Sequence, residues 1–121
     1  MAQIFDSIPS RAVFLNDVLV NNPGYVVIKY GASWCGPCKK IHNYIQEKKS
    51  GLQGNIAFYD LDVDDNMDLY AFLKQKKMVA GIPVILAYKK TNITYVSDFS
   101  VIGTNTTELD LFFDKISEQS S

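Results

Sequence analysis

Apolar positions along the chain follow two different spacings, which together predict an order of strands and helices. Runs rich in β-branched and aromatic residues predict strands over residues 25–30 and 56–63. Residues 83–90 and 93–99 predict two further strands, and the short Thr91-Asn92 link between them is typical of an antiparallel hairpin.

Helical spacing fills the intervals between these strands. Apolar residues three or four positions apart predict helices around residues 10–19, 35–49, 69–76 and 109–116. A helix between the first two strands implies that those strands are parallel. The pattern therefore predicts an α/β fold with one central mixed sheet, in which a parallel core is followed by a C-terminal antiparallel hairpin, flanked by four helices.

Length and composition agree with one globular unit. The chain has 121 residues, of which 47% are hydrophobic and 21% charged, which is typical of a single packed domain. We expect one domain over residues 1–121, with a core from about 8 to 117 and a polar tail over 118–121. The formal net charge of -1 argues against a general nucleic-acid binder, which needs a basic face.

The N-terminal region lacks the pattern of an export signal, because Asp6 and Asn16-Asp17 interrupt its apolar residues. No stretch approaches the roughly 20 apolar residues that cross a bilayer. We therefore expect a protein without membrane association, in the cytoplasm.

Cys35 and Cys38 lie where the first predicted strand passes into a helix. Two cysteines three positions apart at a helix start share one face and can be bridged. The helix dipole can stabilise a thiolate there by up to about 2 kcal/mol, or about 1.5 pKa units. The position predicts Cys35 as the attacking thiol and Cys38, deeper in the helix, as the resolving thiol.

Other readings of this pair fit less well. A zinc site needs about four ligands, whereas the chain offers two cysteines and one histidine, so no metal is expected. A permanent structural disulfide would close a loop too small to restrain the unfolded chain much. An inert reduced pair in the core conflicts with a strand-to-helix turn, because such turns lie at the surface.

Three sequence features carry a family resemblance. Trp34-Cys35-Gly36-Pro37-Cys38 resembles the active-site sequence of the thioredoxin family, Gly81-Ile82-Pro83 resembles its second signature, and Gly103 matches a third. The resemblance extends from the helix near Ser10 to Ile116. It implies a thioredoxin fold and a protein-disulfide reductase.

The resemblance also implies a substrate surface. In this family the proline that matches Pro83 follows a cis peptide bond and faces the cysteines. Because a proline cannot donate to the sheet, the backbone of Ile82 would be free to pair with an extended substrate peptide. Ile102 could join this surface or be an ordinary partly buried residue. The substrate-binding residues expected on this basis are Trp34, Gly36, Pro37, Ile82, Pro83 and Gly103.

The chain departs from the family at two charged positions. Lys29 stands where the family has a strand aspartate, and Asp60 stands where its partner lysine is usual. We hypothesise that Asp60, directly or through water, accepts the proton of Cys38, while Lys29 holds Asp60 in place and favours thiolate. The alternative, in which both residues face solvent or form a purely structural pair, stays open.

Three further positions near the motif are distinctive. Gly31 replaces a common aromatic residue, which predicts looser packing beside the cysteines. Asn43 replaces a kinking proline and predicts a straighter helix. His42, one turn beyond Cys38, is expected to be a core or rim residue, with a direct part in tuning Cys38 as the alternative.

The function predicted from these features is reversible thiol–disulfide exchange through Cys35 and Cys38. No bound cofactor is required, and reducing equivalents would come from NADPH through a thioredoxin reductase. The other expected partners are disulfide-containing proteins, and the chain is expected to be a monomer. Two alternatives remain: a disulfide isomerase or oxidant, and a redox-independent interaction module that uses the surface of Trp34 and Pro83.

Overall fold

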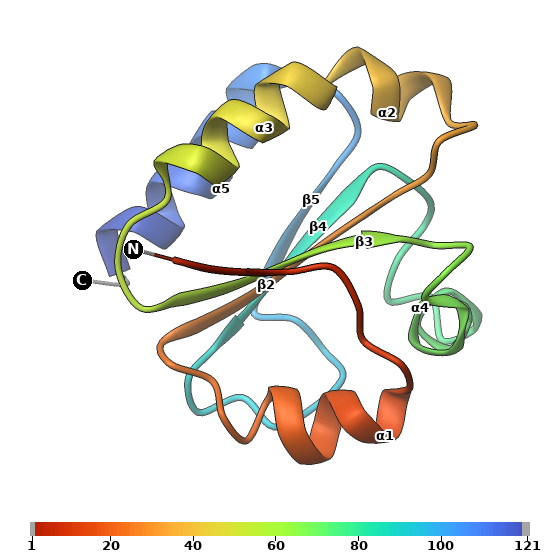
Figure 1. The fold of residues 1–121 in the computed structure, drawn as a ribbon, viewed down its shortest axis with the longest axis vertical. Helices are drawn as coiled ribbons and strands as arrows, with labels where there is room; N and C mark the ends of the chain where they lie inside the picture. Colours follow the sequence, from red (N-terminus) through yellow and green to blue (C-terminus); the bar gives the residue numbers. More distant parts are fainter. Residues whose placement is uncertain (1, 120–121) are drawn as a thin grey trace.

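A five-stranded sheet forms the centre of the computed structural model, which describes residues 2–119 (Figure 1). The strands are arranged in the order β1-β3-β2-β4-β5. Their bounds are Gln3–Phe5 for β1, Tyr25–Gly31 for β2, Ile56–Asp62 for β3, Val84–Lys89 for β4 and Phe99–Ile102 for β5.

The pairing of these strands confirms the predicted mixed sheet. β1, β3 and β2 run parallel, whereas β4 is antiparallel to both β2 and β5. The parallel register places Lys29 opposite Asp60, and Gly31 opposite Asp62. Two positions that the sequence analysis paired are therefore neighbours in the sheet.

Helices cover both faces of the sheet. α2, α3 and α5 lie over one face, and α1 and α4 lie over the other (Figure 1). Because α1 continues into the π-helical turn η1, and only Ile41 separates α2 from α3, four helical stretches are present among residues 2–119. None of the helices in that range is long and apolar enough to cross a membrane. The bounds are Arg11–Val13 for α1, Phe14–Val18 for η1, Gly36–Lys40 for α2, His42–Gly51 for α3, Met67–Gln75 for α4 and Thr106–Gln119 for α5.

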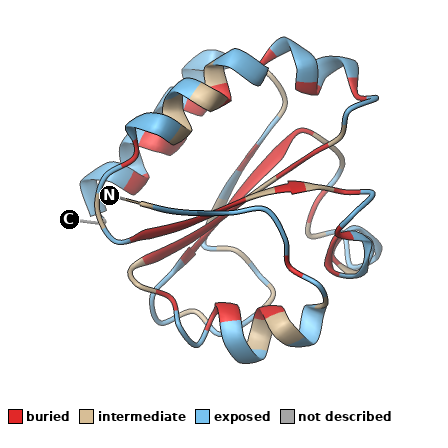
Figure 2. Cartoon of the chain, in the orientation of Figure 1, coloured by how far each residue is buried: buried red, intermediate tan, exposed pale blue. Residues whose placement is uncertain are grey.

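The core consists of two apolar layers, one on each face of the sheet (Figure 2). Alternation along β2 directs Val26 and Ile28 into the layer beneath α1 and α4, and Val27 into the layer beneath α3 and α5. Lys29 and Gly31 continue the second series. The apolar layer under α3 thus gives way to a polar region beneath α2.

The prediction of a strand over residues 93–99 is wrong, because β5 begins only at Phe99. The side chains of Ile93 and Val96 are 67% and 58% exposed and do not pack into the core. The amide of Asn92 donates instead to the Val96 carbonyl at 2.8 Å and to Asp98 at 2.9 Å. A side chain that satisfies nearby backbone and polar groups competes with a sheet ladder, so this segment forms a loop.

Two other features differ from the sequence analysis. The short edge strand β1 was not predicted, because its three residues are all exposed and show no alternation. The helix after the cysteines is not straight: it is interrupted at Ile41, which has φ -104° and ψ 8°. Residues 120 and 121, which belong to the predicted polar tail, lie outside the described residues.

Candidate active site

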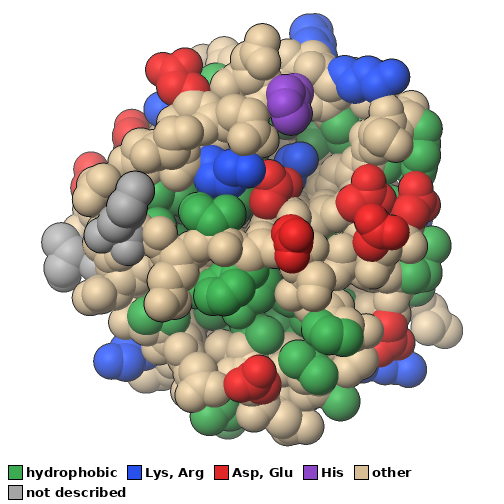
Figure 3. Space-filling view, viewed as in Figure 1, with side chains coloured by type: hydrophobic (Ala, Val, Ile, Leu, Met, Phe, Trp, Pro, Cys, Tyr) green, Lys and Arg blue, Asp and Glu red, His purple; other side chains and the backbone are tan. Residues whose placement is uncertain are grey.

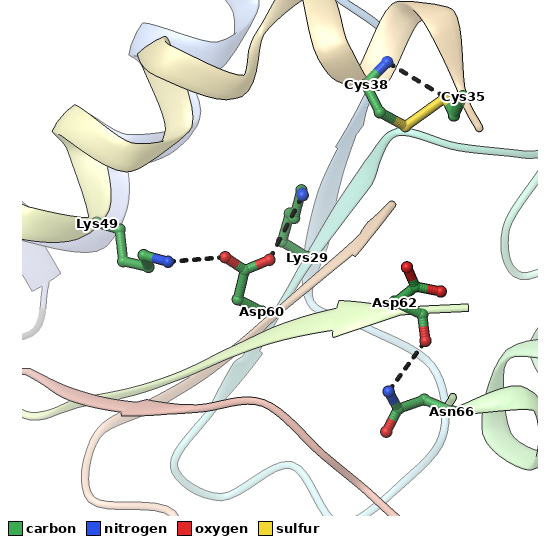
Figure 4. A network of polar contacts seen from close by, with 7 residues as sticks. All are labelled: Lys29, Cys35, Cys38, Lys49, Asp60, Asp62 and Asn66. Carbon is green, nitrogen blue, oxygen red and sulfur yellow. Dashed lines mark hydrogen bonds and ion pairs between the residues drawn. A yellow bond between two sulfur atoms is a disulfide. The ribbon is translucent and has the colours of Figure 1, made fainter. Parts of the chain in front are cut away.

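Cys35 and Cys38 form a disulfide at the N-terminus of α2 (Figure 4). Their Cα atoms are 5.2 Å apart. Cys35 is the N-cap of the helix, and its Sγ accepts a hydrogen bond from the backbone N–H of Cys38 at 3.2 Å. A backbone N–H directed at sulfur favours the thiolate form when the disulfide is open. The predicted bridge is therefore confirmed.

Burial does not distinguish the two cysteines in this oxidised state. Cys35 is 5% exposed and Cys38 is 6% exposed, although Cys38 lies deeper in the helix than the N-cap Cys35, as expected. Their surroundings differ instead. Cys38 lines an open cavity of about 560 Å³, whereas Cys35 does not contribute to its wall. Gly36 and Pro37 between them are exposed.

Asp60 lies between two lysine side chains beneath α2 (Figure 4). Its Oδ1 is 3.4 Å from Nζ of Lys29, and its Oδ2 accepts a hydrogen bond from Nζ of Lys49 at 2.8 Å. The three side chains are only 13–21% exposed. The predicted Lys29–Asp60 pair is confirmed as a contact, and neither side chain faces freely into solvent.

Lys49 is the partner that sequence reasoning missed. It belongs to the last turn of α3, where a positive charge also interacts favourably with the helix dipole. Burial alone would raise the pKa of Asp60. The hydrogen bond from Lys49 and the charges of Lys29 and Lys49 outweigh it, so the net pKa is lowered. Asp60 is therefore ionised at neutral pH.

The cavity beside Cys38 is polar. Figure 3 shows acidic and basic side chains meeting near the middle of one face, close to the single histidine. His42 is exposed and contributes to the cavity wall, so it is a rim residue. The lining residues are Lys29, Gly31, Ala32, Ser33, Cys38, Lys39, His42, Asn43, Asp60, Leu61 and Asp62.

An apolar surface lies on the other side of the motif. Trp34 is 64% exposed, and its indole N–H donates to Asp64 at 2.8 Å. Trp34 and Ile82 both line a second, mostly apolar groove of about 480 Å³ that extends toward Met67 at the start of α4. The hydrogen bond to Asp64, which the sequence analysis did not foresee, fixes the ring in its exposed position.

The expected peptide-binding segments lie at the ends of β4 and β5. The Ile82–Pro83 peptide bond is cis, as the resemblance implied. The backbone N–H of Gly103 donates to the carbonyl of Pro83 at 2.9 Å, which holds the two segments together. Ile102 is 47% exposed and is therefore available to a partner. Contact of Pro83 with the cysteines stays a prediction.

Comparisons with known proteins agree with this geometry. The family model described as Thioredoxin matches residues 9–115. A thioredoxin from Pseudomonas aeruginosa is 37% identical over 68% of this chain and 71% of its own length. Thioredoxin-2 of Saccharomyces cerevisiae is 38% identical over 61% of this chain and 66% of its own length. A crystal structure of Plasmodium falciparum thioredoxin is 26% identical, with a TM-score of 0.67 over 95% of this chain and 89% of that one.

Proposed function

This chain belongs to the thioredoxin family and is a thiol–disulfide oxidoreductase that reduces protein disulfides, and we propose that Cys35 is its nucleophile and Cys38 its resolving thiol. The observation that carries this assignment is the Cys35–Cys38 disulfide at the start of α2, with Cys35 as the N-cap. A thiolate at the N-cap faces unpaired backbone N–H groups, which makes Cys35 the better nucleophile of the two.

The reaction consists of two exchanges. The Cys35 thiolate attacks one sulfur of a target disulfide, the target S–S bond breaks, and the departing target sulfur takes up a proton. Cys38 then loses its proton and attacks the Cys35 sulfur, so that the mixed disulfide breaks and the second target thiol leaves. Two electrons pass to the target, and the chain is left with the Cys35–Cys38 disulfide.

Asp60 accepts the proton of Cys38 through water, and Lys29 holds Asp60 in place. This proposal is supported by two observations: Cys38, Asp60 and Lys29 line one cavity, and Asp60 is ionised. The contacts described above for Asp60 are to Lys29 and Lys49, which is why a water-mediated route is proposed instead of a direct one.

Substrate proteins dock on the surface around the motif. Trp34, Gly36 and Pro37 form its exposed part, and the partly buried Ile82 and Gly103, with the buried Pro83 after the cis peptide bond, form the other part. The support is the exposure of Trp34 next to the disulfide, and the hydrogen bond that holds the segments of Pro83 and Gly103 together. Pairing along such a segment would bind many targets with little dependence on their sequence.

Recycling requires an external reductant. A thioredoxin reductase that draws hydride from NADPH would return the disulfide to the dithiol, and no bound cofactor is needed because the sulfurs carry the electrons. The chain would act as a monomer, since one copy supplies both cysteines and the docking surface. A cytoplasmic location is also proposed, because reduced thiols are maintained there. Cell fractionation would test the location.

Reduction of insulin disulfides tests the proposed function. With NADPH and a thioredoxin reductase, the chain should sustain NADPH oxidation and insulin reduction, and omission of the reductase should stop both. Cys35→Ser should abolish the activity, whereas Cys38→Ser should accumulate a mixed disulfide with the target. Retained biological activity in a variant lacking both thiols would instead support a redox-independent interaction module.

A further inference from the structure

The ammonium group of Lys29 and the sulfur of Cys38 both lie close to Gly31, which has no side chain. A side chain at this position would place its Cβ 2.9 Å from Lys29 Nζ, 3.3 Å from Lys29 Cε and 3.6 Å from Cys38 Sγ. Both groups therefore border the small volume that any residue larger than glycine would fill. Lys29 and Gly31 share one face of β2, so the lysine side chain extends over Gly31 toward Cys38.

The charges around this volume favour an anion at the sulfur. Lys29 from β2 and Asp60 from β3 lie on the sheet side, and Asp60 is also hydrogen-bonded by Lys49. Two ammonium groups thus face one carboxylate. The other charged or titratable groups that line the cavity are Asp62 from β3, Lys39 from α2 and His42 at the start of α3. Of all these groups, only the Lys29 ammonium is found with the Cys38 sulfur among the nearest neighbours of a Cβ placed at Gly31.

We propose that Gly31 is a positioning residue of the redox site: because it lacks a side chain, the Lys29 ammonium lies beside Cys38 and stabilises the thiolate of the resolving cysteine. This inference rests on the exchange reaction proposed above. It concerns a different step from the attack by Cys35, since Cys38 must lose its proton before it can resolve the mixed disulfide.

A methyl group at position 31 is a mild perturbation. The nearest atoms it meets belong to the far end of a flexible side chain, which can move away. Gly31 is not among the residues with positive φ, so the backbone accepts alanine. Gly31→Ala should therefore displace the ammonium and leave the fold intact. Lys29→Met removes the same charge without any change at Gly31.

Thiolate titration by ultraviolet absorbance tests the proposal. The background is Cys35→Ser, in which Cys38 is the single thiol. Gly31→Ala and Lys29→Met should each raise the pKa of Cys38 by about one unit, which is about a tenfold weaker acid. The double variant should show no further change, because both substitutions remove the same interaction. Gly51→Ala is the matched control, since a Cβ there meets nothing within 4 Å, and should titrate like the background.

The outcomes separate this inference from the proposed function. An unchanged Cys38 titration in either single variant overturns the role of Gly31, as does an additive effect in the double variant. Insulin reduction by the unsubstituted chain is measured in parallel. If that activity is absent, the proposed function fails, whatever the titrations show.

Discussion

Lys29 and Asp60 face each other across β2 and β3, with Nζ and Oδ1 3.4 Å apart. The parallel register fixes this pairing, and a second lysine at the end of α3 completes a cluster of two cations around one anion. Exchange of the two charges thus preserves an ion pair, with the cation on β2, the strand that leads into the cysteine motif. Unpaired, either charge would be costly in a half-buried position.

The charge cluster predicts altered pH profiles of disulfide exchange. General base catalysis contributes roughly 10²–10⁴-fold, so Asp60→Asn should slow resolution of the mixed disulfide by at least about 10-fold at neutral pH. Lys29→Ala should shift the rate profile to higher pH, because a cation near Cys38 is lost. Stopped-flow measurement of the exchange rate from pH 5 to about 10 checks both expectations. Unchanged profiles in both variants would mean that the pair is purely structural.

Asp60 should also make the stability of the fold depend on pH. Its folded-state pKa is lowered, because the hydrogen bond and charges of its lysine partners outweigh the effect of burial. A lowered pKa contributes stability above the unfolded value of about 3.9, and that contribution is lost as pH falls through the folded value.

Comparison with Asp60→Asn isolates this contribution. At pH 7 the free energy of unfolding of the variant should be about 1–3 kcal/mol lower than that of the unsubstituted chain. The difference should shrink on acidification toward about pH 2. Urea denaturation at both pH values measures it. Asp114→Asn, at an exposed position, serves as the control and should stay within about 0.5 kcal/mol at either pH. A difference for Asp60→Asn that is equal at both pH values would contradict the linkage.

The hydrogen bond from Trp34 to Asp64 predicts a defect in substrate binding. A bond of this kind contributes about 0.5–1.5 kcal/mol, so Asp64→Ala should raise KM for insulin about 2–10-fold while kcat changes little. Asp64→Asn retains an acceptor oxygen and should behave like the unsubstituted chain. Reduction of a small disulfide, which does not need the Trp34 surface, should be unaffected. Equal losses with insulin and the small disulfide would exclude a role in docking.

The parts of the fold that are predictable from sequence are those with a strong spacing signal. β2, β3 and β4 are mostly buried runs of apolar and aromatic residues, and α5 has four buried residues at helical spacing. β1 gives no such signal because its residues are exposed. The loop before β5 gives a false strand signal. Its β-branched residues resemble a strand, but the backbone of Val96 is hydrogen-bonded by the Asn92 side chain instead of by a neighbouring strand.

The candidate site is likewise predictable where its contacts follow from local structure or strand register, and not where they depend on packing. Cys35 and Cys38 lie close in sequence, so their contact follows from local structure. The Lys29–Asp60 contact needs only the register of two strands. Lys49 and the space at Gly31 depend on how α3 and α2 pack on the sheet, and no local pattern encodes that packing.

A buried hydroxyl on β2 gives a last prediction. Tyr30 is 0% exposed, and its hydroxyl has no hydrogen-bond partner among residues 2–119. An unsatisfied buried polar group costs about 1–3 kcal/mol, so Tyr30→Phe should leave the free energy of unfolding unchanged or raise it by about 1 kcal/mol. Tyr88 is the matched control, because it is equally buried but donates to the Tyr95 carbonyl at 2.8 Å. Tyr88→Phe should therefore cost about 1 kcal/mol. Urea denaturation of both variants decides the matter: if Tyr30→Phe destabilises the fold as much as Tyr88→Phe does, the hydroxyl of Tyr30 is satisfied in solution.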